Sequence, residues 1–307
     1  MPPERGKRNA AAKIYYADLP ESAATSLRHS WRCCHNGIYG GVDCAWYHGV
    51  WQYFSLLNLV STPWDQFEFY DAEIRHLPRR GKPLRILVSG AADHAMLAVV
   101  STALCDRAPH AKFTVVDVCP TPLLANRRFA KKTGLSVETV RADIVAYGEP
   151  STFDAIFSHS FLGNFDEENR PRLIEAWHRL LKPRGRVIMI NRVRPAADTP
   201  TQFSPETANL FVDRVAAAAK AAGQLKGTDT ESLARRARTY VERYRSHPVT
   251  NLRQLLEQFE NGGFDVRHGS AEEGSPAGSG PTTTGAAGRF RFILQSNQAT
   301  TRSDALA

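Results

Sequence analysis

Short apolar, β-branched runs alternate with longer helical patterns through the middle of the chain. Five such runs lie about 20 to 30 residues apart, the spacing of βαβ units: 84–90, 112–118, 137–143, 153–159 and 185–193. The segments 93–106, 121–133 and 167–182 carry apolar residues at helical spacing. Two later runs, 264–269 and 289–297, are joined without a helix. The pattern predicts an α/β fold with a seven-stranded, mostly parallel sheet that ends in an antiparallel pair.

The segments outside this alternation divide the chain into expected parts. Residues 1–12 and 298–307 are polar or small and show no hydrophobic period, so we expect disordered tails. Residues 13–79 precede the first strand and hold an aromatic helical pattern at 45–60, which predicts a helical cap.

Within the expected core, residues 80–297, two stretches interrupt the alternation. Residues 194–262 are longer than one crossover helix requires and contain helical patterns near 205–223, 230–245 and 250–261. We expect this insertion to form a substrate lid. Residues 271–288 are rich in Gly, Ser, Thr and Pro, which predicts a flexible loop between the last two strands.

Composition narrows the class of protein. The chain is 42% hydrophobic and 23% charged, as soluble globular proteins are, and it holds no run of about 18 apolar residues. The N-terminus is polar and basic without the apolar stretch of a secretory signal, so we expect a cytoplasmic protein without membrane contact. The five cysteines are odd in number and unevenly spread, which favours free thiols over a disulfide framework.

The formal net charge is +8, which suits either a polyanionic partner or a generally basic surface. The arginines are scattered and no recognised nucleic-acid-binding module accompanies them, so we expect a small-molecule substrate and no nucleic-acid partner. An acidic group on that substrate is compatible with the charge.

The loop after the first strand, Ser89–His94, is the candidate cofactor loop. Ligands of open parallel sheets bind at the carboxyl ends of strands, where the backbone after the first strand meets a helix N-terminus. Glycine is favoured there because ligand atoms touch the backbone, and Gly90 meets that need. An ordinary strand-to-helix turn is the alternative.

Two carboxylates follow the next strands. Asp117 ends the second strand, 27 residues after Gly90, where it can accept two ribose hydroxyls. The alternative is that it caps the following helix, although Pro120 and Thr121 are nearer its start. Asp143 follows the third strand.

These features at three successive strand ends, with the terminal strand pair, resemble the class I, Rossmann-like family of S-adenosylmethionine (SAM)-dependent methyltransferases. The resemblance covers roughly residues 80–195, and 260–297 in outline. It implies a SAM cofactor held by these residues: Gly90, Ala91, Ala92, Asp117, Val118, Asp143, Ile144 and Ser158. Asp117 would hold the ribose, while Asp143 and the backbone after it would meet the adenine. The family's glycines occupy alternate positions, and Ala92 and His94 depart from that pattern.

We expect the catalytic and substrate-binding residues around the fourth strand and the cap. His159 ends the fourth strand and is the candidate general base. The alternative is that it hydrogen-bonds the backbone or lines the cofactor pocket. His48, Trp51 and Gln52 on the aromatic segment are candidate substrate-binding residues, or else belong to an amphipathic packing helix.

A cysteine- and histidine-rich segment offers an alternative, metal binding, because thiolates and imidazoles suit zinc. Its candidate ligands are Cys33, Cys34, His35, Cys44 and His48. No CxxC or HxxxH pair occurs among them, so the sequence predicts no metal site.

The leading hypothesis is a SAM-dependent methyltransferase acting on a small molecule, for example in natural-product biosynthesis. One alternative keeps the fold and the cofactor but performs cyclisation or rearrangement, or serves as a non-catalytic partner subunit. A nucleic-acid methyltransferase and a dinucleotide dehydrogenase are further alternatives. The sequence leaves open the acceptor and whether the chain forms a homodimer.

Overall fold

The structure is a computed structural model that describes residues 9–34, 43–78, 83–195, 197, 199–271 and 288–298. Most of the expected flexible loop at 271–288 and of the C-terminal tail at 298–307 lies outside these residues, as do residues 1–8.

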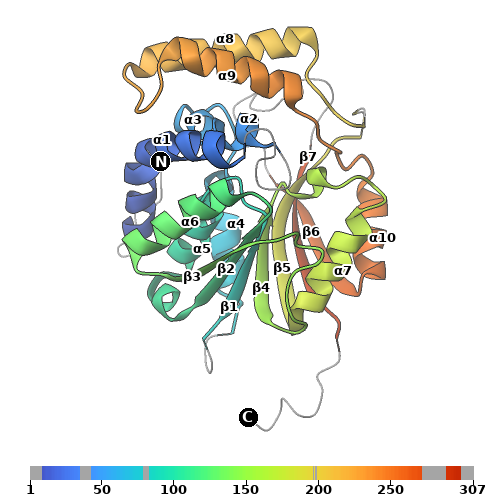
Figure 1. Ribbon diagram of the computed structural model, residues 1–307. Helices are drawn as coiled ribbons and strands as arrows, with labels where there is room; N and C mark the ends of the chain where they lie inside the picture. The colour runs from blue at the N-terminus through green and yellow to red at the C-terminus, as the bar shows by residue number, and fades with distance from the viewer. Residues whose placement is uncertain are drawn as a thin grey trace.

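One seven-stranded sheet, in the order β3-β2-β1-β4-β5-β7-β6, forms the centre of the molecule (Figure 1). The first five strands are parallel neighbours, and β7 lies antiparallel between β5 and β6. The Rossmann-like sheet with its antiparallel last strand is therefore confirmed. The strands are β1 (Arg85–Ser89), β2 (Lys112–Asp117), β3 (Ser136–Arg141), β4 (Phe153–His159), β5 (Leu181–Val193), β6 (Phe264–Ala271) and β7 (Gly288–Ser296).

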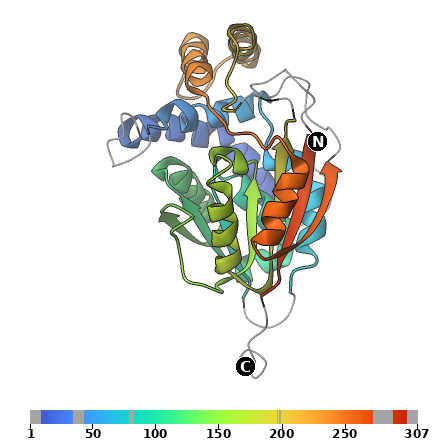
Figure 2. The same ribbon diagram turned by 90° about the vertical axis from the view of Figure 1, so that its right-hand side faces the viewer.

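Helices cover both faces of the sheet because successive strand residues point to opposite sides. Ile86 and Val88 pack with α4 (Phe67–Ile74), α5 (Ala95–Leu104) and α6 (Pro120–Thr133). Leu87, between them, packs on the other face with α7 (Arg170–Leu180) and α10 (Leu252–Asn261). Figure 2 shows α7 and α10 lying against that second face. Short 3-10 turns, η3 (Pro63–Gln66), η4 (Cys105–His110) and η5 (Leu162–Asn164), complete the core.

The segment before the sheet is more helical than expected. The helix α1 (Asn9–Cys33) begins inside the segment 1–12 that we expected to be a disordered tail. Its start is stabilised by an alanine run, which favours helix, and by burial of Ala12 and of Tyr15, which belongs to the main core.

The aromatic segment 45–60 also differs from the single helix expected. It forms α2 (Ala45–His48) and α3 (Trp51–Leu56), separated at Gly49 and Val50. A Cβ at Gly49 would lie 2.7 Å from Ser30 Oγ, so the glycine lets this segment pack closely on α1.

The insertion forms a helix pair, α8 (Pro205–Ala222) and α9 (Thr230–Arg243), that lies across α1–α3 at the top of Figure 1. A third hydrophobic core joins the two layers, with Phe54 of α3 against Phe211 of α8 and Tyr240 of α9. Whether this layer acts as a lid stays a prediction. Of the helices that the structure describes, none combines the length and the apolarity needed to cross a bilayer.

Candidate functional site

A pocket opens at the carboxyl ends of β1, β4 and β5, under the cap and the insertion. The strand order reverses between β1 and β4, the position where open α/β sheets bind ligands. The cofactor loop supplies its floor through Gly90, Ala91, Ala92 and Asp93. The other lining residues are Tyr47, Trp51, Val60, Ser61, Thr62, Pro63, Met96, His159, Ser160, Arg192, Tyr240 and Tyr244.

Gly90 is required at its position for two reasons. Its φ is +72°, in the left-handed region that side chains with a Cβ rarely adopt. A Cβ there would also lie 2.2 Å from Cε2 of Phe161, whose ring packs directly on the glycine. The turn after β1 therefore depends on this glycine.

The departure from the glycine pattern at His94 does not obstruct the pocket. His94 is fully buried, with its ring 4.8 Å from Tyr15 and 5.2 Å from Phe129 between centroids. Burial lowers the pKa of His94 to about 3, and the nearby Lys132 and Arg128 act in the same direction. The side chain is thus a neutral part of the core beneath the loop.

Asp93 is a pocket residue that the sequence did not single out. Its Oδ1 accepts a hydrogen bond of 2.7 Å from the Ala95 amide, which satisfies the start of α5. Its Oδ2 is buried without a hydrogen-bond partner among the described residues. Burial raises the pKa of Asp93 to about 6. A buried oxygen in this condition is a candidate partner for a ligand ammonium group.

Asp117 ends β2 beside the cofactor loop, as the sequence predicted. Its Oδ2 accepts from the Ala91 amide at 2.9 Å and its Oδ1 from the Cys119 amide at 2.7 Å. Burial raises its pKa, opposed by the nearby His48 and by these amides. The N-cap of α6 is Cys119, whose sulfur accepts from the Thr121 amide, so Asp117 does not cap that helix. Each carboxylate oxygen keeps a lone pair for a ribose hydroxyl.

The three residues expected to contact the adenine lie in three different surroundings. Val118 is 49% exposed beyond β2, an apolar surface suited to a flat ring. Asp143 is exposed, and its Oδ1 accepts from the Val145 amide at 2.9 Å. It lines a neighbouring hollow with Asn164 rather than the pocket of the cofactor loop. The Ile144 side chain is buried in the core, which leaves only its backbone for a ligand.

The end of β4 brings His159 to the pocket, but Ser158 points elsewhere. The Ser158 hydroxyl is buried and donates to the Ser89 carbonyl at 3.2 Å. His159 Nδ1 lies 2.9 Å from the Tyr70 hydroxyl. Burial lowers the pKa of His159 to about 3, with smaller contributions from Arg289 and Arg192. So weakly basic an imidazole is a poor general base, since an efficient one has a pKa near the working pH.

Of the three candidate substrate residues in the cap, only Trp51 lines the pocket. Its ring stacks on Tyr47 at 5.1 Å. Gln52 donates to Ser26 on α1 at 2.6 Å, and so acts in packing the cap. His48 is buried behind the cofactor loop, where its ring hydrogen-bonds to the backbone of Ala91.

The upper wall of the pocket includes residues that the sequence analysis missed. Arg192 comes from the end of β5, and Tyr240 and Tyr244 from the end of α9. Burial lowers the pKa of Arg192, and the two tyrosines act in the opposite direction. These residues are far apart in the sequence, so no local motif brings them together.

Comparisons with known proteins agree on the type of domain. Residues 96–185 match a family model described as a methyltransferase domain. The fold is similar to phosphoethanolamine N-methyltransferase 2 of Haemonchus contortus bound to phosphomonomethylethanolamine and S-adenosylhomocysteine. That match has 16% identity and a TM-score of 0.51, and covers 81% of this chain and 57% of the other. The structure of the same enzyme with SAM matches with 14% identity and a TM-score of 0.50. This match covers 86% of this chain and 59% of the other.

Residues 96–185 thus match a methyltransferase domain, and the chain has the Rossmann-like methyltransferase fold. It spans less than two thirds of either Haemonchus contortus chain, and at these identities the likeness is one of fold. No curated protein sequence matches the chain closely enough to count as a relative.

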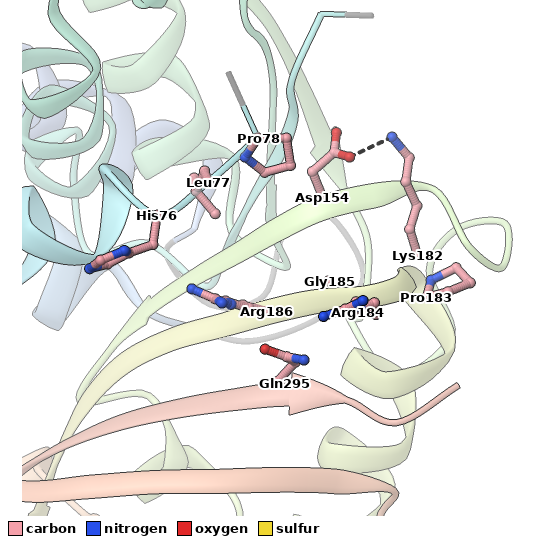
Figure 3. Close-up of a pocket in the computed structure, with 10 residues that line it drawn as sticks. All are labelled: His76, Leu77, Pro78, Asp154, Lys182, Pro183, Arg184, Gly185, Arg186 and Gln295. Carbon is pink, nitrogen blue, oxygen red and sulfur yellow. Dashed lines mark hydrogen bonds and ion pairs between the residues drawn. The ribbon is translucent and has the colours of Figure 1, made fainter. Parts of the chain in front are cut away.

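The residues present fit SAM at the cofactor loop. The unpartnered Asp93 oxygen suits a cationic group, Asp117 suits hydroxyls, and exposed Val118 suits an adenine ring. A second hollow lies at the opposite, amino-terminal end of β4 and β5 (Figure 3). There Lys182 forms a 2.7 Å ion pair with Asp154. This hollow lies away from the cofactor loop.

Proposed function

We propose that this chain is a SAM-dependent methyltransferase that acts on a small molecule. The observation that supports this best is a pocket in which the cofactor loop meets a wall of aromatic side chains and an arginine. The position at the strand-order reversal suits the cofactor, and the enclosing cap and insertion suit a compact acceptor.

In this proposal the cofactor is held from the loop side. Asp117 accepts the ribose hydroxyls, and the backbone around Gly90 to Ala92 contacts the cofactor closely. Asp93 is the partner of the amino group, a role added by its buried and unpartnered oxygen. Val118, after β2, borders the adenine. Asp143 and the backbone of Ile144, after the neighbouring strand β3, border it as well.

The acceptor would lie on the aromatic side of the pocket. Tyr47, Trp51, Tyr240 and Tyr244 offer flat apolar surfaces, and Arg192 offers a cation. Such a wall suits an aromatic or largely apolar acceptor with an anionic group. This reading agrees with the basic net charge without requiring a nucleic acid.

Bound SAM supplies an activated methyl group, whose transfer is an in-line displacement. The chain's contribution is to hold the acceptor close and aligned and to keep out water. With its pKa near 3, His159 is neutral at physiological pH and acts as a hydrogen-bonding wall of the pocket, fixed by Tyr70. Acceptors that need no strong base, such as amines, are therefore favoured.

The site assignment is tested by replacing Asp117 with alanine and measuring the affinity for S-adenosylhomocysteine by calorimetry. Loss of a charged acceptor for two hydroxyls should weaken binding at least tenfold, since such bonds contribute about 1.5–3 kcal/mol. Asp154→Ala, at the other end of the sheet, is the matched control. Equal affinity in wild type and Asp117→Ala would mean that the ribose lies elsewhere.

The alternative chemistries are separated by their products. With deuterium-labelled methyl groups on SAM, a methyltransferase yields a labelled acceptor. Cyclisation or rearrangement yields a product of altered structure without label, and a non-catalytic subunit yields neither. The departures from the glycine pattern at Ala92 and His94 motivate this comparison, although His94 lies away from the pocket.

A further inference from the structure

Three buried cysteines meet behind the cofactor loop. Cys34 follows α1, Cys44 precedes α2, and Cys119 begins α6, so three separate elements contribute. The Cys119 sulfur lies 3.2 Å from that of Cys34 and 3.1 Å from that of Cys44. All three sulfurs lie within 4.8 Å of one another, and each residue is less than a tenth exposed.

The cysteine cluster stands apart from the large hydrophobic cores. The three cysteines form a separate small cluster with Ala45 and are not part of the three large cores that hold the sheet, the cap and the insertion together. A buried free thiol contributes little more than a small apolar side chain. The arrangement instead places three soft ligand atoms around one point.

We propose that Cys34, Cys44 and Cys119 bind a zinc ion. Zinc takes thiolate ligands at about 2.3 Å in tetrahedral geometry, which separates neighbouring sulfurs by about 3.8 Å. The sulfur pairs at 3.1 and 3.2 Å would have to move apart by about 0.6–0.7 Å, which side-chain rotations can supply. A disulfide would require the observed 3.1 Å between Cys44 and Cys119 to shorten to about 2.05 Å and would leave the third thiol out.

Zinc binding changes no oxidation state. Three thiols release three protons as three sulfur–zinc bonds form, which leaves a cluster with one net negative charge. The fourth position is taken by water or by the Thr121 hydroxyl, which lies 3.2 Å from the Cys34 sulfur.

The surroundings suit thiolate sulfur. Cys119 is the N-cap of the 14-residue helix α6, and its sulfur faces the Thr121 amide. The Thr121 hydroxyl in turn lies 3.1 Å from His29 Nδ1, which gives the cluster a second layer of polar contacts.

A zinc ion here would connect the cap to the cofactor site. Cys34 and Cys44 come from the cap, whereas the Cys119 amide donates to Asp117 at 2.7 Å. The ion would thereby fix both the turn after β2 and the start of α2. The inference rests on the contacts of the cysteines and holds for any chemistry in the pocket. Cys33 and His48, weighed with Cys34 and Cys44 from the sequence, stand outside the three-sulfur cluster, and His35 lies outside the described residues.

The test is the metal content of the full chain, purified in reducing buffer without chelators. We expect about one zinc per chain, released when a mercurial reagent blocks the thiols. Cobalt exchanged into the site should show the intense thiolate-to-cobalt absorption of a tetrahedral sulfur site. In Cys44→Ser the zinc content should fall to about a tenth or less, whereas Cys33→Ser and Cys105→Ser should retain it.

Three outcomes would overturn the proposal. A metal-free wild-type chain with five reactive thiols after reconstitution with zinc would make the cluster a set of ordinary buried thiols. A disulfide of Cys119, found by mass spectrometry of the native chain, would make it a redox pair. Another metal bound in place of zinc would overturn the choice of ion. Because the wild-type measurement needs no folded variant and no activity, its failure is distinct from failure of the proposed function.

Discussion

Replacing Asp93 with asparagine should make the protein more stable at high pH. Asparagine has the same shape, and its side-chain oxygen can keep the bond to the Ala95 amide, so the start of α5 is preserved. The change removes only the ability to ionise. In the wild type that ionisation takes place in a site that burial makes unfavourable.

The expected difference in the free energy of unfolding follows from the shift in the pKa of Asp93. The ordinary value is 3.8 and burial raises the pKa of Asp93 to about 6. A raised pKa means that the folded protein holds the proton more tightly than the unfolded chain. The stability contributed by protonated Asp93 is therefore fully present below about pH 4 and is lost as pH rises through about 6. The complete loss is about 3 kcal/mol, of which about 1.4 kcal/mol falls between pH 5 and pH 8.

The assay is urea unfolding of wild type and Asp93→Asn at pH 5 and at pH 8, without cofactor. The advantage of the variant should grow by about 1.4 kcal/mol from the lower to the higher pH. Glu206→Gln, an exposed change on the first turn of α8, reports the effect of net charge alone. If the difference between Asp93→Asn and wild type does not change with pH, the pKa of Asp93 is not raised in the folded protein.

Three further substitutions test other parts of the pocket. Gly90→Ala should lower the free energy of unfolding by about 2 kcal/mol or more, because of its positive φ and the Phe161 ring; unchanged urea unfolding would contradict this. His159→Gln should keep the methyl-transfer rate within about tenfold, whereas loss of a general base costs at least about a hundredfold. Arg192→Gln should raise KM about tenfold for anionic acceptors and leave neutral ones unchanged; equal effects on both would remove its proposed role.

The sheet and its helices were predictable because their signals are local. Each central strand is a short apolar run between polar turns, and the observed strands begin and end within a few residues of the prediction, as β4 at Phe153–His159 shows. The cap was expected to be helical, but the range of α1 was not predicted, because its buried face includes small residues such as Ala23 and Ala24, which give a weak hydrophobic period. Pro20 inside the helix adds a further misleading signal.

The candidate site was predictable where it depends on strand ends and not where it depends on packing. The positions of Gly90 and Asp117 at strand ends were predictable because each residue lies at the end of an apolar run. The burial of Asp93 and the direction of His94 depend on contacts with α1 and α6, which no local pattern contains. Cys119 is 75 residues from Cys44, so the spacing of the N-terminal cysteines alone could not indicate the cluster. The cytoplasmic location and the oligomeric state stay predictions or open questions.

The central claim is that the loop after β1 and the end of β2 form a SAM site. Calorimetric titration of the wild-type chain with SAM and with S-adenosylhomocysteine tests it most directly. We predict saturable binding of both with one site per chain and a dissociation constant below about 1 mM, equivalent to more than about 4 kcal/mol of binding free energy. No binding of either ligand at millimolar concentration would contradict the account.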